Sequence, residues 1–276
     1  KLYVGTERAV GQAVIREAHR HGRWVTGHLG KYRAQDAIVD GIDSIEHIEP
    51  VFDGLLPADF PRLPPMAQRL LMPRPELVAL RTRIFEFKNR IDYGAPNARE
   101  LIGLLVRHRT AVDPTLVVFR NWMLLSDLPE TQQHPDVTLI PGRLRRFWFD
   151  SLSRAGADPE TLALRREHFA KLQQLTGELH RAGVTLMVGT DSPVQFCPPG
   201  GSIHQELALL VEAGLSPAAA LTAATLNNAR ALNQTSNLGS LEAGKLADVV
   251  ILDADPLADI RHTRRIHRVV RSGVVS

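Results

Sequence analysis

Short apolar runs that end on a histidine or an aspartate recur along this chain. Runs of four to eight β-branched and apolar residues are typical of buried strands. Helical periodicity separates these runs, so the strands should be parallel and their polar ends should meet at one edge of a sheet. The three clearest runs are residues 24–28, ending on His28; residues 44–47, ending on His47; and residues 185–191, ending on Asp191.

The same pattern predicts five strand–helix units. Two stretches, at about 50–75 and 120–158, interrupt them as insertions. From residue 238 onward, short strands with glycine turns replace the helical periodicity and predict a small β appendage. The expected strands are 1–4, 24–28, 44–47, 111–118 and 184–189, and the expected helices are 8–21, 33–40, 76–88, one beginning near 97, 159–182, 203–213 and 216–232.

The residues at the strand ends have the chemistry of a metal site. Two imidazoles and a carboxylate suit a divalent transition metal such as zinc. A single histidine at a strand end is more often structural, but three such residues at equivalent positions favour ligation. Asp191 is also the expected catalytic group, as an acceptor of the proton from the attacking water. Glu46 should face the opposite side of its strand from His47 because side chains alternate along a strand.

Three further residues are candidates for substrate contacts. Tyr3 shares a strand face with Lys1, and His204 lies at the start of the helix that follows the Asp191 strand. Trp122, with its neighbours in the loop after the strand at 111–118, is a candidate for setting specificity.

The motifs that carry these residues resemble the amidohydrolase superfamily. His28 is followed nineteen positions later by His47 in Gly-Ile-Asp-Ser-Ile-Glu-His, Gly-Thr-Asp-Ser-Pro occupies 189–193, and the tail at 238–253 is similar to the family's. The resemblance is to the branch that includes prolidase-like dipeptidases and imidazolonepropionase. It implies an α/β fold, a TIM-type (β/α)8 barrel with a small β domain. It also implies a metal-dependent hydrolase that cleaves amide, dipeptide or cyclic amide C–N bonds.

The chain departs from the family pattern at its beginning. The His-x-His pair of the first barrel strand is missing, because His19-Arg20-His21 lies at the end of a helix. Lys1 stands where the binuclear branch has a carboxylated lysine that bridges two metals. We therefore expect a partial barrel of about strands 4–8 in residues 1–236 and a β segment in 237–276. On this interpretation the chain is the C-terminal part of a binuclear zinc enzyme and is inactive alone.

Two alternatives stay open at this point. One is a mononuclear relative such as a deaminase or cyclic amidase, which needs no bridging lysine. The other is a non-catalytic, truncated barrel that serves only as a scaffold.

Composition limits the partners. The 276 residues carry a net charge of +3, and the basic stretch at 261–268 runs into a strand pattern without a nucleic-acid motif. No apolar stretch approaches the roughly 18 residues of a bilayer span. We expect a small-molecule amide or dipeptide as partner, with no nucleic acid and no membrane, and leave a homo-oligomer open. The single cysteine, Cys197, excludes an internal disulfide and leaves the compartment undetermined.

Overall fold

A short parallel sheet organises the larger part of the molecule, which we describe from a computed structural model. The structure describes residues 1–57, 59–60, 74–124, 132–154 and 158–275. Strands β1 (Thr26–Gly27), β2 (Ser44–Glu46) and β3 (Ala111–Asp113) pair in this order, and both pairs are parallel. The parallel arrangement places the ends of β1 and β2, and therefore His28 and His47, on the same edge.

The two outer strands expected from the sequence, 1–4 and 184–189, are reduced to single bridges. Leu2 pairs with Gly27, and Leu186 pairs with Val112. After Leu186, side chains occupy the backbone donors that a strand would use: Val188 N–H donates to Asn228 Oδ1 (3.2 Å) and Gly189 N–H to Asp113 Oδ1 (2.8 Å). The described residues therefore do not form a closed eight-stranded barrel.

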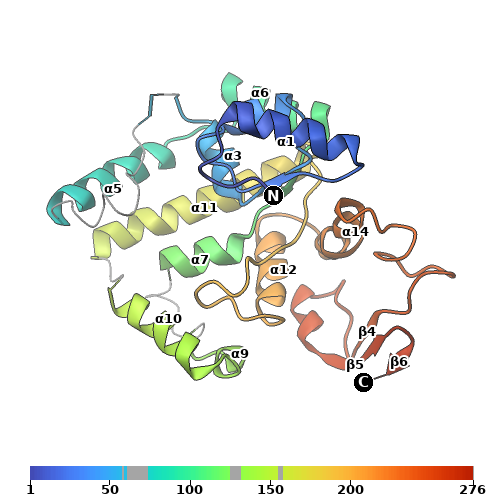
Figure 1. Cartoon of the computed structure of the whole chain (residues 1–276). Helices are drawn as coiled ribbons and strands as arrows, with labels where there is room; N and C mark the ends of the chain where they lie inside the picture. The colour runs from blue at the N-terminus through green and yellow to red at the C-terminus, as the bar shows by residue number, and fades with distance from the viewer. Residues whose placement is uncertain (58, 61–73, 125–131, 155–157, 276) are drawn as a thin grey trace.

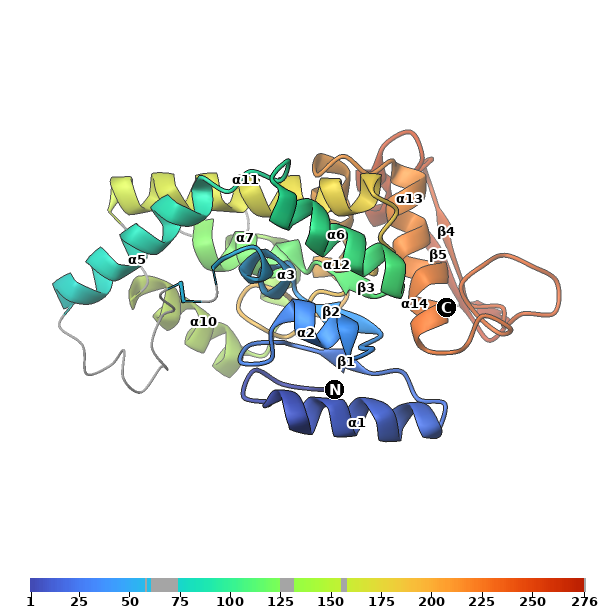
Figure 2. The ribbon, with the colours of Figure 1, turned by 90° about the horizontal axis from the view of Figure 1, so that it is seen from above.

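Helices pack around this sheet. The long α11 packs against α5 and α7 (Figure 1), and α2 packs against α6 (Figure 2). The centre of β2 and the inner faces of α2, α6 and α11 are buried in one apolar core. No described helix has both the length and the apolar character that a membrane span requires. The helices are α1 (Arg8–Arg20), α2 (Ala34–Val39), α3 (Ile48–Gly54), α5 (Arg74–Asn89), α6 (Pro96–His108), α7 (Leu116–Leu124), α9 (Pro135–Thr138), α10 (Gly142–Arg154), α11 (Pro159–Arg181), α12 (Ser202–Glu212), α13 (Pro217–Thr222) and α14 (Asn228–Ala231), with a π-helical segment, Ala223–Asn227, before α14.

The strand expected at 111–118 is wrong beyond Asp113. Thr115 has a positive φ of 46°, and α7 begins at Leu116. The buried carboxylate of Glu206, on α12, accepts hydrogen bonds from Leu116 N–H (2.9 Å) and Val117 N–H (2.6 Å). These are orphan donors of the first helical turn, so Glu206 stabilises a helix where the apolar run predicts a strand.

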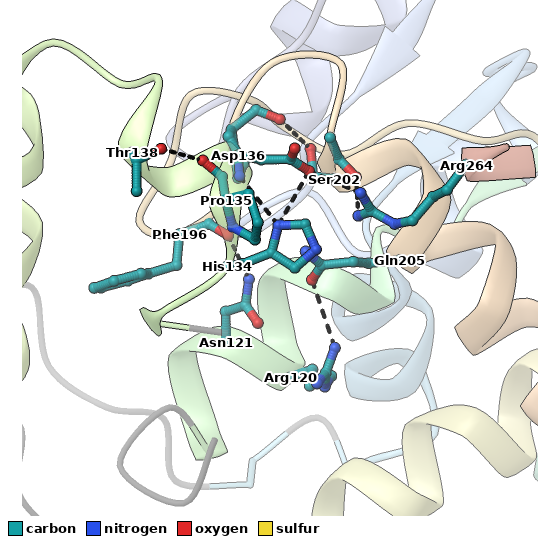
Figure 3. Close-up of polar contacts among 12 residues, drawn as sticks. Arg120, Asn121, His134, Pro135, Asp136, Thr138, Phe196, Ser202, Gln205 and Arg264 are labelled. Carbon is teal, nitrogen blue, oxygen red and sulfur yellow. Dashed lines mark hydrogen bonds and ion pairs between the residues drawn. The ribbon is translucent and has the colours of Figure 1, made fainter. Parts of the chain in front are cut away.

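The insertion expected at 120–158 contains the end of α7 and the helices α9 and α10, joined by turns, and residues 125–131 and 155–157 lie outside the described part. Polar contacts join α9 to the C-terminal segment (Figure 3). The Arg264 guanidinium lies 2.9 Å from Asp136 Oδ2, and Asn121 Nδ2 donates to Phe196 O (2.8 Å). The middle of the Pro-rich stretch, 61–73, also lies outside the described residues.

The C-terminal segment forms an antiparallel sheet at one side of the molecule (Figure 2). Strands β4 (Val249–Leu252), β5 (Ile266–Arg271) and β6 (Val274–Val275) pair in this order. A 3-10 helix, η3 (Ile260–Arg264), packs on α12 and buries Ile260 in the main core.

Candidate functional site

His28, His47 and Asp191 meet at the carboxyl edge of the parallel sheet. The imidazole rings of His28 and His47 lie 4.3 Å apart between centroids, at an angle of 70°. His47 Nε2 lies 4.0 Å from Asp191 Oδ2. His28 follows β1, His47 follows β2, and Asp191 follows the segment that bridges to β3. The structure thus brings together the three residues that the strand ends predict to be neighbours.

One nitrogen of His47 is held, and the other faces the site. The His47 side chain is buried, and its Nδ1 lies 2.7 Å from Thr115 Oγ1. Its Nε2 is buried and has no hydrogen-bond partner in the described part of the chain. A buried polar atom without a partner is unfavourable unless something binds it, so this nitrogen indicates a ligand position.

Both imidazoles favour the neutral form. Burial, then the charge of His28, lowers the pKa of His47 to about 4. Burial, and next the charge of Lys1, also lowers the pKa of His28. Neutral imidazole is the form that coordinates metal ions.

Three residues around this edge have unusual backbone conformations. The φ angles are 69° at His47, 46° at Thr115 and 46° at Asp191. Positive φ in residues other than glycine is uncommon and concentrates at functional sites. All three contribute directly to the cluster described here.

Glu46 does not line the cavity, but its charge acts on both His28 and His47. Its carboxylate accepts a hydrogen bond from Thr26 Oγ1, and Glu46 is opposite Asp113 in the β2–β3 register. The positive φ of His47 ends the regular alternation directly after Glu46. Burial, and next the charge of Glu46, raises the pKa of Asp113 to about 7.

A cavity of about 440 Å³ opens beside the three residues. His28, His47 and Asp191 all contribute to its wall. Its volume is in the range of small-molecule sites. Trp122 also contributes, but it belongs to helix α7 and not to the loop expected after residue 118.

A second group of charged residues borders the same cavity and was not predicted from the sequence. Buried Lys88 lies 2.6 Å from Glu49 Oε1 and 2.7 Å from Asp53 Oδ1. Fully buried His168 lies 3.3 Å from Glu49 Oε2. These residues are far apart along the chain. A lysine in a helix with other charged residues is usually exposed to solvent, so the sequence does not single out Lys88. The cluster becomes visible only where α5 packs against α3 and α11.

The remaining predicted site residues lie at the margin or elsewhere. Lys1 is exposed, and the Tyr3 ring, 63% exposed, lies 5.2 Å from the His28 ring in an edge-on arrangement. His204 Nδ1 lies 3.0 Å from Thr263 Oγ1, at the contact between α12 and η3. Neither Lys1, Tyr3 nor His204 is among the residues that line the cavity.

The donor set fits a transition metal in chemistry, although its atoms are spread too widely to hold one as they stand. No group of three or more His, Cys, Asp or Glu side chains within the described ranges is close enough to hold an ion. Neighbouring donors of a tetrahedral zinc ion are about 3.3 Å apart. His47 Nε2 and Asp191 Oδ2 are 4.0 Å apart. A change of rotamer at the exposed Asp191 side chain is enough to shorten this distance to that of two zinc ligands.

Relatives and solved structures resemble this chain in part. An imidazolonepropionase of Brevibacillus brevis is 34% identical over 101 residues, which are 34% of this chain and 23% of that protein. An ochratoxinase of Aspergillus niger is 38% identical over 106 residues, 35% of this chain and 21% of that protein.

The structural matches extend over nearly the whole chain. A bottromycin amidohydrolase has a TM-score of 0.69 at 23% identity, covering 99% of this chain and 54% of that one. An Xaa-Pro dipeptidase has a TM-score of 0.59 at 19% identity, covering 98% and 48%. The chain therefore spans about half the length of these structures, and its fold is of their (β/α)8 type. Because the model of the amidohydrolase family matches residues 5–275, the chain belongs to the amidohydrolase family.

Proposed function

We propose that this chain contributes the active site of a metal-dependent hydrolase of C–N bonds in amides, dipeptides or cyclic amides. The observation that carries the proposal is His47 Nε2, a buried nitrogen without a partner among the described residues, which faces His28 and Asp191. Membership of the amidohydrolase family supports the reaction class.

His28, His47 and Asp191 would hold the metal, for which zinc is our first candidate. Thr115 would fix the His47 ring through Nδ1, so that Nε2 points to the metal. When bound, a zinc ion supplies an electrophile that polarises the amide carbonyl and acidifies water. We also propose that Lys1, as a carbamate, would supply an anionic ligand for a second metal ion.

Asp191 would move the proton. Its carboxylate accepts a proton from the water whose oxygen attacks the carbonyl carbon. The same carboxyl group then returns that proton to the amide nitrogen as the C–N bond breaks, so the products are a carboxylic acid and an amine. Its position beside the cavity gives it access to both atoms. Residues 1–236 would carry this chemistry, and 237–276 would form the separate β segment.

The test measures zinc binding before activity. Titration of the metal-free chain with zinc in a calorimeter should give a saturable site, and a chelator should reverse it. Zinc-loaded protein is then assayed with dipeptides and N-acyl amino acids. Failure to bind zinc, or hydrolysis that continues unchanged after chelation, would contradict the proposal.

A further inference from the structure

The cavity beside the candidate metal site has a largely apolar wall that the proposed chemistry does not use. Phe119 and Trp122, from α7, form part of this wall. Leu56, Phe60 and Ile84 also line the cavity. The reacting atoms of an amide need none of these side chains, so the wall is available to the rest of the substrate.

Arg33 is a cation in the same cavity, and its side chain has one polar contact. It precedes α2, and its guanidinium donates to the backbone oxygen of Leu56 (2.9 Å). Across the described ranges, no carboxylate lies within ion-pair distance of Arg33. The guanidinium has five N–H donors in a planar fork, so further donors remain for a ligand.

The other charges in the cavity are already compensated or assigned. Lys88 contacts both Glu49 and Asp53 within 2.7 Å, so its charge is balanced inside the protein. Asp191 also lines the cavity and is assigned to the proposed metal site. An anion entering the cavity would therefore find its ionic partner in Arg33, whereas a cation would have to compete with Lys88.

We propose that the cavity selects amides that carry both a carboxylate and a bulky apolar group, with Arg33 binding the carboxylate and the Phe119–Trp122 wall holding the apolar group. This inference rests on the proposed hydrolase function. It narrows the substrate class to N-acylated or peptide-like amides of apolar amino acids. Small neutral amides and amines with a second positive charge would bind weakly.

Three probes separate the two contacts. N-acetyl-L-phenylalanine has the amide, the ring and the carboxylate; N-acetyl-L-phenylalaninamide lacks the carboxylate; N-acetylglycine lacks the ring. Calorimetry on the metal-free chain should show that the first binds at least about tenfold more tightly than either of the others. A hydrogen-bonded ion pair and a buried ring each contribute enough for this ratio.

Variants assign each preference to its residue. Arg33→Gln should bring the ratio between the acid and its amide to about one and keep the preference for the ring, while Arg33→Lys should retain part of the acid preference. Trp122→Ala should weaken the preference for the ring over N-acetylglycine and keep the preference for the acid over its amide. Lys31→Gln is the matched control, because Lys31 is exposed, pairs with Glu7 and does not line the cavity.

The outcomes distinguish this inference from the proposed function. Equal binding of the three probes, no binding of N-acetyl-L-phenylalanine at millimolar concentration, or an unchanged acid preference in Arg33→Gln would each overturn the inference. Probe selectivity in a chain that does not bind zinc would instead overturn the proposed metal-dependent function and leave the binding preference standing. Hydrolysis by zinc-loaded protein without selectivity among the probes would overturn the binding preference and leave the hydrolase function standing.

Discussion

Two buried histidines near one cavity illustrate different uses of the same side chain. His47 lies at the sheet edge between the rings of His28 and Phe119. His168 lies on α11 between Phe52 and Phe85. Each has one nitrogen without a hydrogen-bond partner in the described part of the chain, Nε2 of His47 and Nδ1 of His168. The surroundings of that nitrogen therefore distinguish the two sites.

Around His168, charges are compensated within the protein. Its Nε2 contacts Glu49, which pairs with Lys88, and its Nδ1 lies in a core of aromatic rings. Around His47, a second imidazole and a carboxylate approach the open nitrogen without closing on it. The contacts around His168 join neighbouring helices, whereas His47 Nε2 remains available to bind a ligand. We infer that a buried polar atom without a hydrogen bond indicates function only where other ligand atoms lie close to it.

The largest expected effect is on stability, from Lys88→Met. Removal of the buried ammonium would leave Glu49 and Asp53 as uncompensated charges, so the free energy of unfolding should fall by about 3–5 kcal/mol. Urea denaturation measures it. Lys31→Met, which breaks the exposed and solvent-screened pair with Glu7, should leave it nearly unchanged. Similar small effects in both variants would mean that the cluster is solvated.

The second prediction compares the two histidines directly. His47→Ala should weaken zinc binding at least about a hundredfold, because under the proposed function it removes a ligand and not a supporting contact. His168→Gln should lower thermal stability and leave zinc affinity within about threefold. Calorimetric titration and melting curves on both proteins give the two readouts. Zinc affinity that falls equally in both variants would remove the distinction drawn here.

The third prediction concerns Asp191→Asn. The amide oxygen can still coordinate weakly, so much of the zinc should remain, whereas loss of the proton acceptor should reduce turnover of an amide by at least about a hundredfold. Metal analysis of the assayed samples separates the two effects. Near-normal turnover would leave Asp191 with only a role in the turn before Pro193.

The position of the candidate site at one edge of the sheet could be predicted from the sequence, but the lengths of the strands could not. His28, His47 and Asp191 could be placed together because parallel strands share a carboxyl edge. The strand lengths could not be predicted, because partners distant in sequence decide them: Glu206 starts α7 after Thr115, and Asn228 takes the N–H of Val188.

The cluster around Lys88 was invisible for a related reason. Lys88 and Glu49 are 39 positions apart, and His168 is 119 positions from Glu49. None of the three residues forms part of a local motif, and a lone lysine or glutamate on a helix is usually exposed to solvent. The positive φ of His47 was also not predictable, because strand alternation assumes regular backbone angles.

A smaller effect should follow from Thr115→Val. Valine keeps the shape of the side chain but leaves His47 Nδ1 without its hydroxyl partner, so the ring is no longer fixed. Zinc affinity should fall about tenfold, the lower range for loss of a contact that supports a ligand. Thr115→Ser, which keeps the hydroxyl, is the control and should bind zinc nearly as the native chain does. Equal affinity in the two variants would show that Thr115 does not orient His47.

The last prediction compares the two histidine regions by the pH dependence of unfolding in the metal-free chain. Unfolded His47 takes up a proton as pH falls through its ordinary pKa of 6.5, whereas burial and the charge of His28 delay protonation in the folded state to about pH 4. Acid therefore favours unfolding between these values, by at most about 1.4 kcal/mol per pH unit. Glu49 differs: although burial favours its neutral form, the charge of Lys88 keeps its pKa below the ordinary 4.5, so its stabilisation is lost only below that pH.

Urea denaturation across this range should thus show that His47→Gln flattens the slope between pH 6.5 and 4 and leaves the acid limb unchanged. An unaltered slope in His47→Gln would mean that His47 is as accessible to protons in the folded state as in the unfolded one. That result would contradict its burial and, with it, the distinction between an open and a compensated histidine.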